Sequence, residues 1–142
     1  MMAYAFNSNG LTGLREHHIA AVVKVVSRHV GHTTDKNVSV ALLPDDKMRA
    51  LNKTYRQKDT TPNVLSFPSH DKNHPDFLGE VLIAVPHARR EAEKLGEESV
   101  AYMQFLVVHG LLHLSGYDHM DGDSAEMMES LEHKIITELA SL

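Results

Sequence analysis

Residues 99–114 (SVAYMQFLVVHGLLHL) predict an α-helix that is apolar on nearly every side. Such a helix cannot lie on a protein surface, so the pattern predicts a central helix that other elements surround. Ser99 or Glu98 is expected to begin it. Gly116 is expected to end it, because glycine readily takes the left-handed conformation that closes helices.

The rest of the chain alternates between strand and helix patterns. Strands are expected at residues 3–6, 38–43, 63–67 and about 79–85, and helices at about 12–30, 44–59, 86–95 and from about 124 onward. Thr12 is the expected N-cap of the first helix. The order β-α-β-α-β-β-α-α-α predicts an α+β (α/β) fold, with a small mixed sheet of about four strands covered by about five helices. At 142 residues the chain is expected to form a single domain, 1–142.

Apolar residues recur at helical spacing in two of these segments, and each set predicts a buried helix face. In residues 44–59 the set is Met48, Leu51 and Tyr55. In the last helix the set is Met128, Leu131, Ile135, Leu139 and Leu142.

The composition argues against several classes of protein. Hydrophobic residues make up 42% of the chain, yet no apolar run is long enough to span a bilayer. The first residues, MMAYAFNSNG, lack the pattern of a signal peptide. Cysteine is absent, which excludes disulfides and thiolate metal ligands. These features predict a cytoplasmic protein with no membrane partner, and the net charge of −5 argues against a protein that coats nucleic acid non-specifically.

The charges are unevenly distributed along the chain. From Lys47 to Lys58 there are five basic residues and no acidic one, whereas from Asp118 onward there are seven acidic residues and one lysine. The acidic segment is interpreted as a solvated helix face. For the basic segment, a solvated face and a phosphate-binding patch are both open.

Three histidines lie close together at the end of the apolar helix, in the sequence HGLLHLSGYDH. His109 and His113 are four residues apart, so both imidazoles leave the same helix face, as two ligands of one ion must. Gly116 allows the chain to turn back, and His119 is then expected to approach the ion from another side. The pattern predicts a metal site with these three ligands. The alternative is three core histidines with ordinary hydrogen-bond partners.

Three nitrogen ligands leave a tetrahedral ion one open position, which is typical of catalytic metal sites. One Zn²⁺ per chain is expected, although nickel, cobalt or copper would also bind such a set. The other histidines lack comparable spacing. His70 and His74 are expected in an exposed loop, and His87 at the start of a helix.

Gly110 follows the first histidine, where metalloproteases with this spacing carry a glutamate as general base. Glycine can accept no proton, so the pattern argues against peptide hydrolysis by that mechanism. A bound ion alone still lowers the pKa of its water to about 7. A reaction at such a site then requires stabilisation of negative charge in the transition state rather than a general base. Cleavage of a phosphodiester fits this requirement, because an arginine can bind the anionic phosphate with two hydrogen bonds.

Two arginines of the basic segment, Arg49 and Arg56, are candidates for this clamp. Arg56 lies just after a helical pattern and before a break at Lys58-Asp59, where its side chain could reach over a cleft. A surface ion pair between Arg56 and Asp59 is equally consistent with the residues alone.

Three motifs together resemble the YbeY family, the endoribonucleases and rRNA maturation factors of bacteria. HGLLHLSGYDH is similar to that family's H-G-x-L-H-L-x-G-Y-D-H signature. LNKTYRQKD followed by NVLSFP, and then LGEVLI, resemble two further family segments in the same order. The resemblance covers essentially the whole chain.

The resemblance implies that His109, His113 and His119 bind one Zn²⁺ and that Arg56 is catalytic. It implies a zinc-dependent, single-strand-specific endoribonuclease that acts in rRNA maturation, at the 3′ end of 16S rRNA, and in ribosome quality control. The implied partner is rRNA in the small ribosomal subunit, with ribosomal proteins or a ribosome-associated GTPase as further candidates.

Two other functions stay open. One is a hydrolase of another substrate, such as a peptide, with metzincin-like histidine spacing. The other is a non-catalytic ribosome assembly factor with a structural zinc, which suits an acidic protein because it binds free RNA weakly. The nucleophile, a hydroxide or the 2′-hydroxyl, is open as well. Asp118 could orient an imidazole or equally cap the turn, and Glu80 could assist proton transfer if its strand borders the metal.

Overall fold

The computed structural model describes residues 1–118 and 121–142. Within them the expected order of strands and helices is confirmed, with four strands and five α-helices. The elements are β1 (Ala3–Asn7), α1 (Glu16–His29), a 3-10 turn (Gly31–Thr33), β2 (Asn37–Leu43), α2 (Asp45–Arg56), β3 (Val64–Pro68), β4 (Phe77–Ala84), α3 (Val85–Leu95), α4 (Ser99–Leu114) and α5 (Gly122–Ala140).

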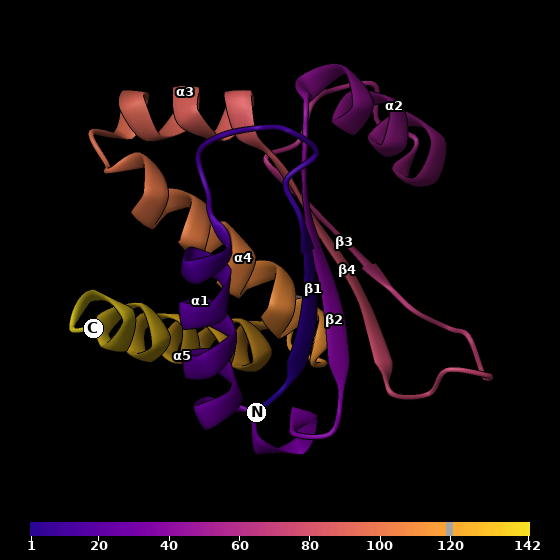
Figure 1. The fold of residues 1–142 in the computed structure, drawn as a ribbon, viewed down its shortest axis with the longest axis vertical. Helices are drawn as coiled ribbons and strands as arrows, with labels where there is room; N and C mark the ends of the chain where they lie inside the picture. The colour runs from indigo at the N-terminus through magenta and orange to yellow at the C-terminus, as the bar shows by residue number, and fades with distance from the viewer. Residues whose placement is uncertain (119–120) are drawn as a thin grey trace.

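The sheet is mixed, as expected, with the strand order β1-β2-β4-β3. β1, β2 and β4 are parallel, and β3 runs antiparallel to β4 with Ser66 opposite Val81. β3 is therefore an edge strand. The loop between β3 and β4 extends away from the rest of the molecule (Figure 1).

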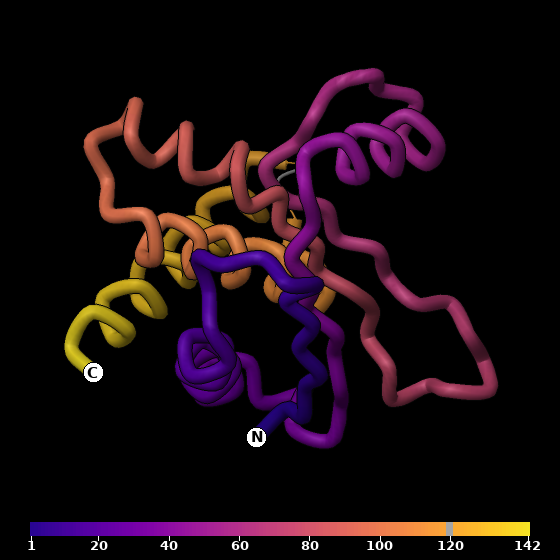
Figure 2. The backbone as a smooth tube through the Cα atoms, turned by 45° about the horizontal axis from the view of Figure 1, so that its top comes forward, coloured from indigo at the N-terminus to yellow at the C-terminus, as the bar shows by residue number. Residues whose placement is uncertain are grey.

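The helices divide unequally between the two faces of the sheet. α1, α4 and α5 lie on one face, and α2 lies over one end of the other (Figures 1 and 2). The main core forms between α1, α4, α5 and the first face. A smaller core lies under α2 and consists of Ala41, Met48, Leu65, Leu82 and Ala84.

α4 is the central helix that its apolar sequence predicts. Its buried residues point in nearly all directions: Tyr102, Met103, Leu106, Val107, Val108, Gly110, Leu111, Leu112 and Leu114. Burying a leucine or valine side chain stabilises a fold by about 1.5–3 kcal/mol, so this helix contributes strongly to the core. Across the described residues, neither α4 nor any other helix combines the length and hydropathy needed to cross a membrane.

The helix boundaries correct two expectations. α1 begins at Glu16 rather than near Thr12, because Gly13 has a φ of +123°, which no α-helix contains. α2 ends at Arg56, earlier than expected, because Gln57 takes the left-handed conformation at φ +59°.

Two expected helix faces are only partly buried. Met48 is fully buried, but Tyr55 is 62% exposed rather than packed in the core. In α5, Met128 and Ile135 are fully buried, Leu131 and Leu139 are half-buried, and Leu142 is exposed beyond the end of the helix.

Candidate metal centre and the groove beside it

The last two turns of α4 place His109 and His113 side by side. Their rings are 4.6 Å apart between centroids and nearly perpendicular, and their Nε2 atoms are 3.1 Å apart. Both side chains line a groove, whereas the residues around them on the helix are buried in the core. The helix therefore directs two imidazole nitrogens to one point at the protein surface.

This geometry fits two ligands of one metal ion. Two nitrogens at about 2.0–2.1 Å from a tetrahedral ion are about 3.3 Å apart, close to the observed separation. His119, the third expected ligand, lies outside the described residues. Within residues 1–118 and 121–142, no three histidine, aspartate or glutamate side chains gather closely enough to hold an ion. The structure thus brings together two of the three predicted ligands.

The chain turns sharply after His113. Tyr117 N–H donates to the Leu112 carbonyl (3.0 Å) and Gly116 N–H donates to the His113 carbonyl (3.1 Å), the pattern of a Schellman motif. Gly116 has a φ of +103°, which a residue with a side chain rarely adopts. The prediction that Gly116 ends the helix is confirmed, and after the turn Tyr117 and Asp118 line the groove.

Glu132 of α5 contacts the histidine pair through His109. Its Oε1 lies 2.8 Å from Nδ1 of His109, and its side chain is 10% exposed. Sequence reasoning missed this residue. The signal was a carboxylate on the buried face of α5, four residues after Met128 and three before Ile135.

The groove joins the histidine pair to the basic segment. It has a volume of about 800 Å³ and is lined by α2 and the loop after it, by β3, and by the end of α4. Its lining residues are Asn52, Arg56, Lys58, Thr60, Pro62, Val64, Leu65, Ser66, Pro68, His109, His113, Gly116, Tyr117 and Asp118. Arg56, Lys58 and the two histidines, far apart in sequence, thus share one cleft.

Arg56 is held at the wall of this groove. Its guanidinium donates to the Ser66 carbonyl (2.7 Å) and lies 5.4 Å from the centre of the Phe67 ring. A guanidinium has five N–H donors, so it can hold the strand and still contact a phosphate. The alternative of an ion pair with Asp59 is wrong, because Asp59 pairs with Arg49 instead (2.8 Å).

The pair between Arg49 and Asp59 fixes the loop that follows α2. The guanidinium hydrogen-bonds to the Asp59 carboxylate and lowers its pKa. The buried side chain of Asn52 donates to the Thr60 carbonyl (3.0 Å), which holds the same loop from inside. Both contacts keep Lys58 and Thr60 at the groove.

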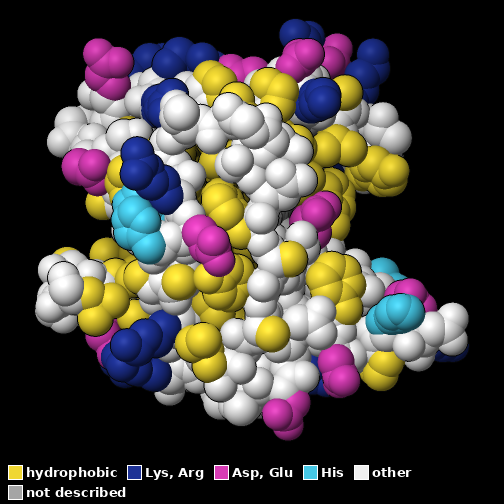
Figure 3. All heavy atoms as spheres, viewed as in Figure 1, with side chains coloured by type: hydrophobic (Ala, Val, Ile, Leu, Met, Phe, Trp, Pro, Cys, Tyr) yellow, Lys and Arg dark blue, Asp and Glu magenta, His cyan; other side chains and the backbone are white. Residues whose placement is uncertain are grey.

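The basic side chains at this end of the molecule are mixed with acidic ones. Figure 3 shows Lys and Arg side chains over α2 and α3 with carboxylates between them. Arg49 pairs with Asp59, and Arg90 pairs with Asp45. The surface is therefore not uniformly positive, and the basic residues that line the groove, Arg56 and Lys58, form a local patch.

The structure explains why residue 110 is a glycine, which the sequence around it did not reveal. A Cβ atom at position 110 would lie 2.7 Å from Val81 Cγ1 and 3.0 Å from Ser66 Oγ. The position faces the sheet rather than the groove. A glutamate there would collide with β4 before it could act as a base, so the packing of α4 itself requires glycine.

The other candidates are dispersed. Glu80 interacts with Ser39 (3.4 Å) and precedes Val81, which packs against α4, so Glu80 points to the opposite face of the sheet. This placement argues against a role in proton transfer at the histidines. His87 lies in the first turn of α3 beside Glu91 (3.5 Å). Asp118 does line the groove.

His70 and His74 lie in the protruding loop between β3 and β4, as expected. His74 is 67% exposed and lies 3.7 Å from the Asp71 carboxylate. The loop therefore contributes no histidine to the lining of the groove that contains His109 and His113.

Comparisons with known proteins place the chain in a family. A family model described as "Endoribonuclease YbeY" matches residues 9–140. The protein named endoribonuclease YbeY in Pseudomonas entomophila is 44% identical over 110 residues, which span 75% of this chain and 70% of that protein. The one in Stutzerimonas stutzeri is 42% identical over 111 residues, 74% of this chain and 68% of the relative.

A solved structure shares the fold. The solution structure of TM1509 from Thermotoga maritima matches with a TM-score of 0.68 and 23% identity, over 98% of this chain and 89% of that one. The likeness in fold extends across the sheet and its helices. Together with the family match over residues 9–140, these relatives establish that the chain belongs to the YbeY family.

Proposed function

We propose that this protein is a metal-dependent endoribonuclease. His109, His113 and His119 hold the ion, and Arg56 is the catalytic residue that stabilises negative charge on the phosphodiester. The observation that carries the proposal is the shared groove, which places the histidine pair and Arg56 in one cleft. The relatives named endoribonuclease support the same substrate class.

The donor set suits a divalent ion such as Zn²⁺, because two imidazole nitrogens converge at a separation that one ion can bridge. When bound, such an ion supplies Lewis-acid chemistry. Arg56 supplies a planar donor fork that matches two phosphate oxygens, and its contacts with Ser66 and Phe67 hold that fork in place. Lys58 adds positive charge along the same wall.

The proposal extends to the biological role. We propose that Zn²⁺ is the resident ion, that single-stranded RNA is the substrate, and that the protein acts in the cytoplasm on rRNA. The role is in maturation of the 16S rRNA 3′ end and in ribosome quality control, in contact with the small ribosomal subunit and its proteins or an associated GTPase. Family membership supports these assignments. The net charge of −5 favours a partner that contributes affinity for RNA.

The first experiment measures metal content and RNA cleavage on the same samples. Wild type and His113→Ala are purified without added metal and analysed by elemental mass spectrometry. About one zinc per chain and cleavage of single-stranded RNA are expected for the wild type. Both are expected to fall in the variant. A folded wild type that stays metal-free after zinc is offered would overturn the proposal.

The same experiment separates an enzyme from an assembly factor. A protein that uses zinc only to brace the turn after α4 would bind the ion and leave RNA intact. A terminal 2′,3′-cyclic phosphate on the products would identify the 2′-hydroxyl as nucleophile.

A further inference from the structure

Glu132 is a carboxylate at a position of α5 where the helical pattern predicts an apolar residue. It lies on the buried helix face between Met128 and Ile135, both fully buried, and only 10% of its side chain is exposed. Burying a carboxylate is unfavourable unless it has a partner. Its partner among the described residues is Nδ1 of His109, at 2.8 Å.

A purely structural role does not explain this choice well. Replacing a buried ion pair with apolar residues of similar volume is often neutral or stabilising, and the neighbouring positions on this face are already apolar. A leucine at position 132 would continue the stripe. The presence of a carboxylate at this position is therefore better explained by its contact with His109 than by packing of the core.

The contact determines which nitrogen of His109 carries the proton. An ionised carboxylate can only accept, so Nδ1 must be the donor. In a neutral imidazole, Nε2 is then unprotonated, and it is the Nε2 atom that faces Nε2 of His113 at 3.1 Å. Carboxylates that accept from a metal-binding histidine in this way fix its tautomer and its ring orientation.

We propose that Glu132 is a positioning residue of the metal site: it accepts the Nδ1 proton of His109 and so directs the unprotonated Nε2 atom toward the ion. This inference rests on the metal site of the proposed function. It adds a residue from α5 to the histidine pair of α4. Asp121 caps α5 by accepting from Ser124 N–H (2.8 Å), so this helix begins at Gly122, three residues after His119 in the sequence.

The test compares zinc affinity in variants of α5, measured on metal-free protein by competition with a chromophoric chelator. Glu132→Leu removes the carboxylate and extends the apolar stripe, and Glu132→Gln keeps the shape but is a weaker acceptor. We expect Glu132→Leu to weaken zinc binding about 10- to 100-fold and Glu132→Gln to weaken it less. Without metal, Glu132→Leu should unfold at the same temperature as the wild type or higher.

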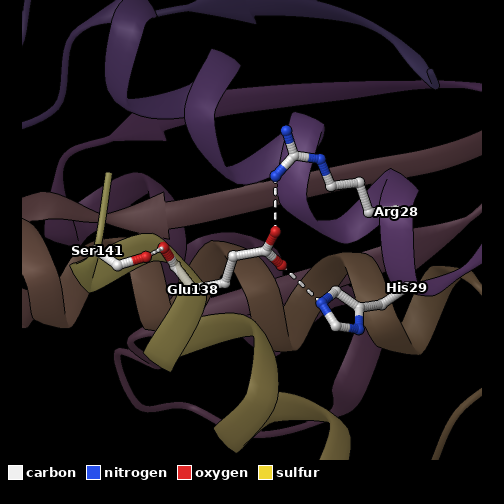
Figure 4. A network of polar contacts seen from close by, with 4 residues as sticks. All are labelled: Arg28, His29, Glu138 and Ser141. Carbon is white, nitrogen blue, oxygen red and sulfur yellow. Dashed lines mark hydrogen bonds and ion pairs between the residues drawn. The ribbon is translucent and has the colours of Figure 1, made fainter.

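The matched control is Glu138→Gln on the same helix. Glu138 accepts from Arg28 (2.6 Å) and interacts with His29 (2.7 Å), which ties α5 to α1 (Figure 4). This variant loosens α5 without touching His109, so its zinc affinity should equal that of the wild type. An equal loss of affinity in both variants would show that Glu132 only anchors the helix, and would overturn the proposal.

The histidine tautomer gives a second readout that does not depend on metal or activity. In long-range ¹H–¹⁵N spectra of the metal-free protein, His109 should be protonated at Nδ1 in the wild type and lose this preference in Glu132→Leu. If Glu132→Leu does not fold, the affinity of Glu132→Gln decides the question.

Three results have distinct meanings. Weaker zinc binding and a changed tautomer in a folded Glu132→Leu support the positioning role. Unchanged affinity in that variant overturns it and leaves the proposed function standing. A wild type that binds no zinc would remove the metal site, and the positioning role with it.

Discussion

Gly110 of α4 lies directly against Val81 of β4, so that a Cβ atom at position 110 would come within 2.7 Å of Val81 Cγ1 and 2.9 Å of Cγ2. The helix that carries His109 and His113 therefore sits as close to the sheet as a glycine permits. This close approach also brings Ser66 Oγ within 3.4 Å of the Gly110 carbonyl. The position of the histidine pair relative to Arg56 thus depends on this close approach of α4 to the sheet.

Gly110→Ala should destabilise the protein. In a helix with open space, this change stabilises by about 1 kcal/mol through helix propensity. Here the overpacking against Val81 should outweigh that gain and produce a net loss of about 1–2 kcal/mol. Chemical unfolding of the metal-free protein measures the change. A Gly110→Ala, Val81→Ala double variant should show favourable coupling between the two positions, whereas additive effects would contradict the packing explanation.

Arg56→Ala should lower the rate of RNA cleavage by about 100-fold or more while the zinc content stays the same, because the variant loses charge stabilisation and keeps the ligands. Arg56→Lys keeps the charge but not the planar fork, so it should be impaired as well. Lys47→Ala on the same helix is the control, since Lys47 does not line the groove. Full cleavage activity in Arg56→Ala would show that Arg56 is not the catalytic residue.

The central position of α4 was predictable because a helix that is apolar on every side is favourable only in the interior of the protein. The start of α1 was not, because Leu11 and Leu14 match helical spacing, whereas Gly13 between them has a positive φ and packs closely against Val85 and Met103. Local patterns carry no information about such distant contacts.

The same distinction holds for the site. His109 and His113 were predictable from their spacing along one helix. Glu132 was not, because its role depends on how α5 packs against α4. Arg56 and Asp59 are close in sequence, yet Asp59 pairs with Arg49, because Arg56 ends the helix and turns toward β3.

The tie between α1 and α5 should depend on pH. Hydrogen bonds from His29 and Arg28 lower the pKa of the Glu138 carboxyl, so the ionised form is favoured in the folded state. Such a group stabilises the protein above its unfolded pKa, and this contribution is lost as the pH falls through the lower, folded pKa. The wild type should therefore unfold at a higher temperature than Glu138→Gln at neutral pH, and the difference should vanish in acid. Thermal unfolding in a chelating buffer measures it. A difference that persists after Glu138 is protonated would contradict the electrostatic cause.

Zinc should stabilise the folded protein through its histidine ligands. An ion that binds only the folded state adds about 2.7 kcal/mol when its free concentration is 100 times its Kd, which corresponds to a rise in Tm of roughly 5–10 °C for a chain of this size. His113→Ala should lose most of this shift, whereas His74→Ala, in the protruding loop, should keep it. Differential scanning fluorimetry across a zinc titration distinguishes them. If His113→Ala kept the full shift, the ion would be binding elsewhere on the protein, and the assignment of the α4 histidines as its ligands would be wrong.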